Sequence, residues 1–385
     1  MSLKKYKKIF LITSNRSEYG ILRNLIQKSK RSKKLKLNLI VTGAHLNKLF
    51  GSTINEIIKD NNKIFHKIKI NQSNKKSEKA YLQSSKIISS FSKLFLKYRP
   101  DLIMILGDRF EIFSVAIAAV FNNFPIAHLY GGEVTEGSMD EIFRHSITKM
   151  SNFHFVSTKK SKNRVRQLGE NPEDIFIVGS LGVENIKKMN FKSRSELAKK
   201  LKISFEKRNI MLSYHPERKK SKIVSDLRNI FLALKSLKNT NIFMTMPNPD
   251  EGNSIIYRRI IENVKKNDNF FFIKSMGSEN YLSMISHVDL IIGNSSSGII
   301  EAPSLKTPSI DIGDRQKGRE RAKSVFHCKP NKKEILNLIN KILRKKNNKL
   351  NFKNPYEKSN TSKKIIKILE NINYKSNLVK KFYNI

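Results

Sequence analysis

Charged side chains directly follow an apolar run in the motif ILGDRFE, residues 105–111. The run over residues 102–106 is short and wholly apolar, which predicts a buried strand. An acidic side chain at the end of such a strand is a candidate general base. We expect Asp108 to fill this role and Arg109 to position Asp108 or the substrate. The alternative for Asp108 is structural, as the cap of the helix that follows.

A second group of charged residues lies in AHLYGGEVTEGSMDEIFRHSITKMS, residues 127–151. Ser138 and Glu141 have the spacing of a capping box, so we expect a helix with Asp140 in its first turn and Arg144 one turn further on the same face. The apolar side of this helix should face the core and its charged side solvent or a cleft. The apolar residues concerned are Ile142, Phe143, Ile147 and Met150. The glycine pair before Glu133 would let the backbone approach a ligand. The carboxylates of these motifs suit reactions that move protons.

A third segment, DLIIGNSSSGIIEAP at residues 289–303, joins an apolar run to a glycine, an asparagine and three serines. Backbone N–H groups at the start of the next helix, with the hydroxyls of Ser295 and Ser296, would donate to a phosphate. Glu301 would accept hydrogen bonds from ribose hydroxyls. The alternative is helix capping by Asn294 or Ser295, but a cap requires one such residue and not four. We therefore expect a phosphate-binding loop.

Loops after other expected strands carry further candidates. Arg315, in GDRQKGRER at 313–321, offers a guanidinium fork to phosphate oxygens. Arg16 and Ser17 lie in TSNRSEYG at 13–20, and His215 in SYHP at 213–216 would act as acid, base or phosphate donor. The Walker and GxGxxG glycine patterns are both absent from the sequence. No His or Cys pair has the spacing of metal ligands, so we expect no metal and no other cofactor.

Short β-rich runs alternate with longer amphipathic stretches, which is typical of parallel sheets built from βαβ units. We expect strands at residues 9–13, 37–41, 102–106, 126–129, 153–157, 175–178, 210–213, 242–246, 270–273, 290–292 and 309–312. They predict an α/β fold of two Rossmann-like, doubly wound domains, 1–181 and 182–361, with a helical segment at 362–385. Residues 344–358 are expected to be a solvated connection. An interdomain cleft at the carboxyl ends of both sheets would bind the ligand.

Composition narrows the class of protein. A chain of 385 residues, 39% hydrophobic and 28% charged, suits two globular domains. The net charge of +43 is spread along the chain and not clustered, so we interpret it as a compositional bias and expect no nucleic-acid partner. The apolar runs are shorter than the ~20 residues that span a bilayer. No membrane segment and a cytoplasmic enzyme are therefore expected, and a single cysteine agrees with that location.

Seven motifs, taken together, resemble those of the hydrolysing UDP-N-acetylglucosamine 2-epimerases of sialic-acid synthesis. They equally resemble relatives that act on UDP-N,N'-diacetylbacillosamine in legionaminic-acid synthesis. The motifs are SNRSEYG, ILGDRFE, HLYGGEVTEG with MDEIFRHSITKMS, YHP, MPNPDEG, GNSSSGIIEAP and IGDRQKGRE. The resemblance implies a GT-B fold, a UDP-sugar substrate, no required metal and a homodimer. It also implies elimination of UDP across C1 and C2 to a glycal, followed by hydration to the free C2-inverted sugar.

The resemblance further implies roles for single residues. The proton-transfer residues would be Asp108, Glu133, Asp140 and His215, with Arg109 and Arg144 on the sugar side. The UDP contacts would be Arg16, Ser17, Asn248, Ser295, Ser296, Glu301 and Arg315. Many sialic-acid members have a glutamate at the position of Tyr130, so both hexosamine substrates remain open. The alternative function is a GT-B glycosyltransferase that passes the sugar to an acceptor, although the acidic cluster favours an epimerase.

Overall fold

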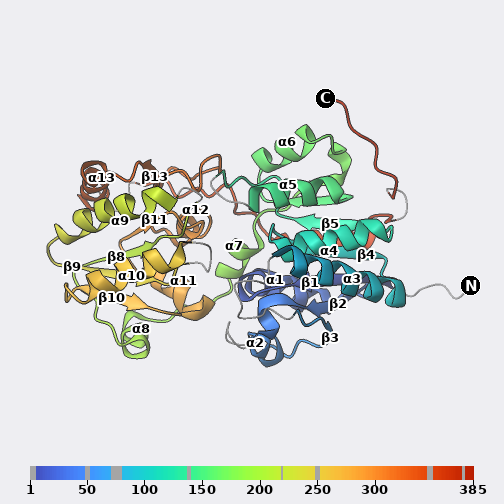
Figure 1. Cartoon of the computed structure of the whole chain (residues 1–385), viewed down its shortest axis with the longest axis horizontal. Helices are drawn as coiled ribbons and strands as arrows, with labels where there is room; N and C mark the ends of the chain where they lie inside the picture. The colour runs from blue at the N-terminus through green and yellow to red at the C-terminus, as the bar shows by residue number, and fades with distance from the viewer. Residues whose placement is uncertain are drawn as a thin grey trace, which may run out of the picture. The chain divides into compact units, whose positions relative to one another are not determined.

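The computed structural model describes residues 6–47, 53–70, 80–136, 140–217, 220–247, 252–344, 350–374 and 378–385. The chain forms two compact units (Figure 1). Unit 1 comprises Met1–Glu133, Asp140–Asn185 and Lys358–Ile385. Unit 2 comprises Val134–Met139 and Ile186–Glu357. The chain therefore leaves unit 1 and returns to it at the C-terminus.

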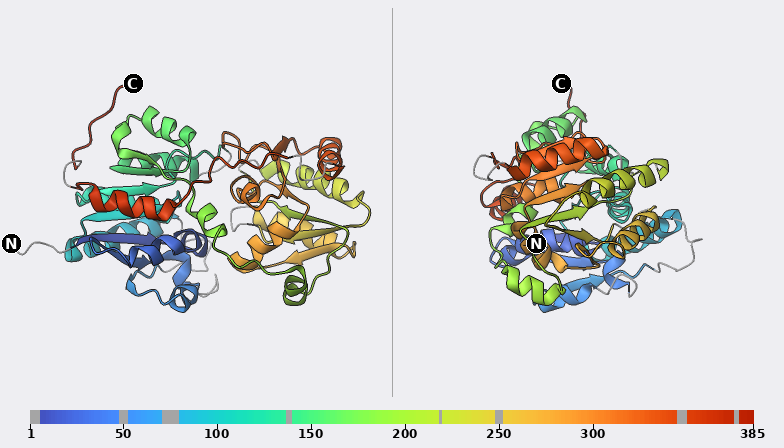
Figure 2. Two further views of the ribbon diagram at one scale, coloured as in Figure 1. Left: turned by 180° about the vertical axis from the view of Figure 1, so that it is seen from behind. Right: turned by 90° about the vertical axis from the view of Figure 1, so that its left-hand side faces the viewer.

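Unit 1 contains a seven-stranded parallel sheet in the order β3-β2-β1-β4-β5-β6-β7. The strands are β1 Lys7–Thr13, β2 Leu35–Val41, β3 Ile64–Lys67, β4 Leu102–Leu106, β5 Ile126–Leu129, β6 Phe153–Val156 and β7 Ile175–Ile177. Successive side chains of a strand point to opposite faces, and helices cover both faces here. Ile9 and Leu11 of β1 pack in the core shared with α1 (Arg16–Ser29) and α14 (Thr361–Asn371), whereas Phe10 and Ile12 pack in the core shared with α3 (Ala80–Tyr98) and α4 (Phe110–Phe121). Helices α3 and α4 lie in front of the sheet in Figure 1, and the red α14 lies in front of it in the reverse view of Figure 2. The strand order reverses between β1 and β4, which is where open α/β sheets bind ligands.

Unit 2 repeats this architecture with six parallel strands in the order β10-β9-β8-β11-β12-β13. The strands are β8 Arg208–Ser213, β9 Thr240–Thr245, β10 Phe270–Ile273, β11 Leu290–Gly293, β12 Ser309–Ile312 and β13 Val325–Cys328. Buried residues of α9, α10 and α13 form one core against the sheet, and residues of α11 form the other. The strand order of this sheet reverses between β8 and β11. The loops after β8 and β11 therefore correspond to the loops after β1 and β4 in unit 1.

Helices connect the strands of each unit. Those of unit 1 are α1 Arg16–Ser29, α2 Ile54–Lys59, α3 Ala80–Tyr98, α4 Phe110–Phe121, α5 Asp140–Met150, α6 Lys159–Gln167, α7 Leu181–Ile186, which continues to the first residue of unit 2, and α14 Thr361–Asn371. Those of unit 2 are α8 Arg194–Leu201, α9 Lys220–Lys235, α10 Asn253–Val264, α11 Gly277–His287, α12 Ser297–Ile300 and α13 Lys332–Arg344. In the described ranges, every helix is too short or too polar to cross a lipid bilayer.

Each strand expected from the sequence is present to within a residue or two of its expected bounds. Two strands were missed, β3 and β13. Both are edge strands, and in each some side chains remain partly or fully exposed. Edge strands with a solvated face do not produce the continuous apolar run that identifies a central parallel strand.

Two expectations about the C-terminal part are wrong. The helix expected over 362–385 ends at Asn371, where Nζ of Lys7 donates to the carbonyl oxygens of Leu369, Glu370 and Ile372. A cation on the last carbonyl groups is a favourable end to a helix. The connection at 344–358 is not simply solvated, because Tyr356 is only 1% exposed. The many Lys and Asn residues of this segment gave no sign in the sequence that Tyr356 is buried.

Candidate active site

A buried histidine holds the loop that follows β4 in unit 1. His128 on β5 has no exposed surface, and its Nε2 lies 2.8 Å from the carbonyl oxygen of Gly107. Its Nδ1 lies 3.2 Å from Oγ1 of Thr148 on α5. Burial lowers the pKa of His128 to about 3, so the neutral ring donates from Nε2 to the carbonyl. His128 thereby fixes the backbone directly before Asp108.

Asp108 is bound by a buried arginine and does not cap the following helix. The N-cap residue of α4 is Arg109, whose side chain makes no capping hydrogen bond. Nε of Arg144 donates to Oδ2 of Asp108 at 2.9 Å, and NH2 of Arg144 donates to the same oxygen. NH1 of Arg144 donates to Oε2 of Glu141 at 2.5 Å and to the carbonyl oxygen of Glu133 at 3.0 Å. One guanidinium therefore joins the loop after β4, the first turn of α5 and the backbone at Glu133, which precedes α5.

Most of the apolar side of α5 faces the core as expected, since Ile147 is fully buried and Met150 packs against the same core, but the side chain of Arg144 is buried as well. The Arg144 side chain is only 2% exposed, whereas that of Asp108 is 26% exposed. The charged side of α5 was expected to face solvent or a cleft and Ile142 the core, but Ile142 is 56% exposed. Burial alone lowers the pKa of Arg144, but the carboxylates of Asp108 and Glu141 raise it more, so the net shift is upward. Ion pairing thus compensates the desolvation of this charge.

Arg109 points to two buried carboxylates of unit 1. Its Nε lies 3.2 Å from Oε2 of Glu111, which is almost completely buried. Glu18 on α1 also attracts Arg109 electrostatically. The Glu18 carboxylate accepts hydrogen bonds from the backbone N–H of Ser14 at 2.6 Å and from Nδ2 of Asn15 at 2.6 Å. Burial raises the pKa of Glu18 to about 7 despite these hydrogen bonds. Two acidic groups therefore hold Arg109 beside the loop after β1.

Arg16 and Ser17 begin α1 directly after that loop. Both side chains are exposed, and the helix is capped by Asn15, whose Oδ1 accepts from the backbone N–H of Glu18 at 3.0 Å. The expected strand-to-helix loop is therefore present, and both residues stand at the helix end that carries the positive pole of the dipole.

The glycine pair in the HLYGGEV segment is required by the packing of the chain itself. A Cβ atom at Gly131 would lie 2.9 Å from Oγ1 of Thr148, and one at Gly132 would lie 2.3 Å from the carbonyl oxygen of Ser161. Gly132 also has a φ of +72°, in the left-handed region. These glycines are therefore required by close contacts with α5 and α6, and their expected role in the approach of a ligand stays a prediction.

Glu133 and Asp140 flank a short stretch that lies partly outside the described residues. Glu133 is buried and accepts a hydrogen bond from Oγ of Ser161 at 3.3 Å. Asp140 is half-buried in the first turn of α5, as expected. The capping role expected for Ser138 lies outside the described residues.

Tyr130 has its hydroxyl on the start of α7. The hydroxyl lies 3.0 Å from Oγ of Ser180 and accepts from the backbone N–H of Gly182 at 3.2 Å. Tyr130 has a φ of +71°, which is rare for a bulky side chain. The hydroxyl of Tyr130 thus contacts residues 180–182, and the expected influence of this position on the choice of sugar stays a prediction.

In unit 2, β11 ends in a glycine that no other residue can replace without movement. A Cβ atom at Gly293 would lie 2.0 Å from the carbonyl oxygen of Ser213 at the end of β8, and its φ is +131°. The serines that follow lead into α12, which is only four residues long. Its N-cap residue, Ser296, makes no side-chain capping bond, and Oγ of Ser295 accepts from the backbone N–H of Ser297 at 3.4 Å. These serines are thus in a tight turn at the point where the strand order of unit 2 reverses.

His215 is buried in the turn that follows β8. It is 8% exposed, and its backbone N–H donates to Oδ1 of Asn294 at 2.7 Å. Burial, together with the nearby guanidinium of Arg315, lowers the pKa of His215 to about 3. The imidazole is therefore neutral near pH 7, with one N–H donor and one acceptor nitrogen.

The loop after β12 supplies the guanidinium of Arg315, whose NH1 donates to the carbonyl oxygen of Asn294 at 3.1 Å. Glu301 follows α12, and its Oε2 is buried without a hydrogen-bond partner among the described residues. Burial raises the pKa of Glu301 to about 6, although the positive charge of Arg319 opposes this. Asn248, the remaining expected contact, lies outside the described residues.

Three polar residues that lie close to these candidates were not singled out from the sequence. Glu111 holds Arg109, and Gln316 donates from Nε2 to the carbonyl oxygen of Asn294 at 3.0 Å. Both lie one or two positions from a predicted arginine, which could have drawn attention to them. Burial raises the pKa of Tyr281 on α11, and the hydroxyls of Ser297, Ser213 and Ser295 oppose this, so Tyr281 lies beside the turn of serines that follows β11. A tyrosine inside an amphipathic helix gives no signal in sequence.

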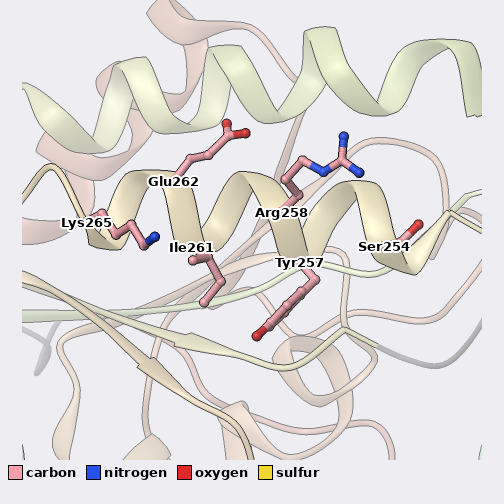
Figure 3. Close-up of a pocket in the computed structure, with 6 residues that line it drawn as sticks. All are labelled: Ser254, Tyr257, Arg258, Ile261, Glu262 and Lys265. Atoms are coloured by element: carbon pink, nitrogen blue, oxygen red, sulfur yellow. The ribbon is translucent and has the colours of Figure 1, made fainter.

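Other features of the surface do not coincide with these residues. An open hollow of about 420 Å³ lies along α10 and is lined by Ser254, Tyr257, Arg258, Ile261, Glu262 and Lys265 (Figure 3). It contains none of the candidate residues. In the part of the chain that the structure describes, no three His, Cys, Asp or Glu side chains are grouped as metal ligands would be.

The two units define the class of protein: an α/β protein of the GT-B type. In each unit, polar residues follow the two strands between which the strand order reverses. The UDP-N-acetylglucosamine 2-epimerase from Neisseria meningitidis, solved with UDP-N-acetylglucosamine, has this fold. It matches with a TM-score of 0.80 and 17% identity over 94% of this chain and 99% of that one.

Sequence comparison identifies the family within this class. Residues 27–370 match the UDP-N-acetylglucosamine 2-epimerase family, and the chain belongs to it. It is 40% identical to polysialic acid biosynthesis protein P7 of Escherichia coli, over 98% of each chain. It is 39% identical to the hydrolysing GDP/UDP-N,N'-diacetylbacillosamine 2-epimerase of Campylobacter jejuni, over 84% of this chain and 85% of the relative.

Proposed function

We propose that this protein is a hydrolysing UDP-N-acetylhexosamine 2-epimerase, which releases UDP and a free sugar inverted at C2. The observation that carries the proposal is the family membership, since two relatives at 39% and 40% identity cover most of the chain. Their names point to the synthesis of nonulosonic acids. The substrate is either UDP-N-acetylglucosamine or UDP-N,N'-diacetylbacillosamine.

The reaction has two steps that the candidate residues suit chemically. A base removes the proton from C2 while the C1–O bond breaks, so that UDP leaves and a C1–C2 double bond forms. Water then adds its hydroxyl to C1, and a proton is delivered to the opposite face of C2. The partly exposed carboxylate of Asp108, held by Arg144, is supported as a proton-transfer group, together with Glu133 and Asp140.

The departing diphosphate requires donors and positive charge. The neutral imidazole of His215 and the guanidinium of Arg315 are suited to stabilise it. Ser295 and Ser296, with Arg16, Ser17 and Asn248, are the further proposed contacts of UDP. Oε2 of Glu301 is buried and has no hydrogen-bond partner among the described residues, which supports Glu301 as the acceptor for ribose hydroxyls.

Arg109 and Arg144 are proposed to act at the sugar end. Because Arg144 is almost completely buried and donates to Asp108, we infer that it acts through Asp108. A homodimer and a cytoplasmic location complete the proposal, the latter because a single cysteine suits a reducing compartment.

Incubation in D₂O without an acceptor tests the function. The protein is mixed separately with UDP-N-acetylglucosamine and with UDP-N,N'-diacetylbacillosamine, and products are followed by NMR. We expect release of UDP, a transient glycal and a free manno-configured sugar with deuterium at C2. The substrate that is converted decides between the two hexosamines. If both remain unchanged until an acceptor is added, the protein is a glycosyltransferase and the proposal fails.

A further inference from the structure

Asn294 is a fully buried side chain whose amide clamps the turn that carries His215. Its Oδ1 accepts from the backbone N–H of His215 at 2.7 Å, and its Nδ2 donates to the carbonyl oxygen of the same residue at 3.0 Å. The same Nδ2 donates to Oε1 of Glu217 at 3.1 Å. An amide is required here, because only asparagine offers a donor and an acceptor at this length.

The backbone of Asn294 binds a second loop. Its carbonyl oxygen accepts from NH1 of Arg315 at 3.1 Å and from Nε2 of Gln316 at 3.0 Å. Gln316 has no exposed surface, so this contact is part of the core. The loops after β8 and β12 are therefore both attached to the first residue after β11.

Helix capping does not account for these contacts. The N-cap residue of α12 is Ser296, two residues further along the chain, and the hydrogen bonds of the Asn294 side chain go to the turn after β8. The β8–β11 pairing brings Gly293 opposite Ser213, which places Asn294 beside the start of that turn.

We propose that Asn294 is a positioning residue that fixes His215 and Arg315 relative to one another. The inference rests on the proposed function, in which these two residues stabilise the departing diphosphate. Asn294 acts through them and touches neither the sugar nor the phosphate. A displacement of about 1 Å in such a group costs on the order of 100-fold in rate.

The side chain and the backbone of Asn294 can be separated experimentally. Asn294→Asp keeps the shape and the acceptor for the His215 N–H, but it places a carboxylate oxygen against the His215 carbonyl and the Glu217 carboxylate. The backbone carbonyl that holds Arg315 is unchanged. We expect kcat to fall by about 100-fold. The Kd for UDP should stay within roughly threefold, because Arg315 is still held by the backbone carbonyl of residue 294 and the proposed UDP contacts are not substituted.

Asn209 provides a matched control in the same unit. It is also fully buried, its Oδ1 accepts from the backbone N–H of Glu206 at 3.1 Å, and its Nδ2 donates to the Glu206 carbonyl at 2.8 Å. It lies at the opposite end of β8 from His215. Asn209→Asp should lower the unfolding temperature as Asn294→Asp does, yet leave kcat within about threefold of wild type.

The measurements are kcat and KM for the UDP-sugar, the Kd for UDP by calorimetry, and the unfolding temperature. A selective loss of kcat in Asn294→Asp supports the proposal. Equal kcat in the two variants overturns it, and so does a parallel loss of UDP binding. If Asn294→Asp does not fold, Glu217→Met is the second variant, because it removes one hydrogen-bond partner of the Asn294 amide. We expect kcat to fall by about tenfold, which corresponds to the loss of one modest hydrogen bond. An unchanged kcat in Glu217→Met overturns the proposal. A wild-type protein without turnover refutes the proposed function instead.

Discussion

Replacement of Arg144 tests whether one buried guanidinium holds the loop after β4 against the start of α5. Arg144→Ala leaves the carboxylates of Asp108 and Glu141 and the carbonyl of Glu133 without this donor. Removing one partner of a buried ion pair costs about 3–5 kcal/mol. Because Asp108 and Glu141 are 26% and 20% exposed, water can partly replace the lost contacts, so we expect a cost of about 3 kcal/mol, at the lower end of that range.

Arg144→Lys separates charge from geometry. Lysine keeps the positive charge but cannot reproduce the fork that reaches Asp108 through Nε and NH2. The loss of one charged hydrogen bond, about 2 kcal/mol, corresponds to roughly a 30-fold decrease in kcat. The KM should change less, because Arg144 is buried and acts through Asp108.

Arg259 on α10 is the control for Arg144. Both arginines pair with a glutamate three positions away, but the Arg259–Glu262 pair is 45% and 43% exposed. Exposed pairs contribute less than about 1 kcal/mol. The assay is thermal unfolding, in which about 3 kcal/mol corresponds to roughly 6–12 °C for a domain of this size. If Arg144→Ala shifts the unfolding temperature no more than Arg259→Ala, the buried ion pairs of Arg144 do not stabilise the fold more than an exposed pair, and the prediction is refuted.

Two further predictions concern a glycine and a histidine. Gly293→Ala should abolish UDP binding in calorimetry, because its Cβ would lie 2.0 Å from the Ser213 carbonyl oxygen; retained affinity would show that β8 and β11 can separate there. The pKa of His128, lowered to about 3 in the fold, lies below its unfolded value near 6.5. The unfolded state therefore binds more protons between these values, and stability should fall as pH decreases from 6.5 toward 3. His128→Gln should weaken this dependence in unfolding measured against pH, and an identical slope would contradict it.

The central strands and the loops after them could be predicted from local sequence. The apolar run before Asp108 and the run before Gly293 are continuous because both faces of a parallel sheet are covered. A doubly wound sheet then brings the loops after its inner strands to one edge. This is why Asp108 and His215 were found as candidates without coordinates, whereas the half-exposed edge strands β3 and β13 were not.

Only the tertiary structure decided how the polar residues are used. The sequence predicted that Arg144 lies on a helix face directed to solvent or a cleft, and helix capping by Asn294 was only the alternative to a phosphate-binding loop. In the structure Arg144 is buried on Asp108, and Asn294 binds two other loops. These contacts join residues far apart in the chain, and no local pattern encodes them. The charge pattern of a helix shows which residues are polar, but burial depends on whether distant groups satisfy their hydrogen bonds. The sequence by itself thus determined the family and the positions of the loops, while the tertiary structure determined which side chains hold them.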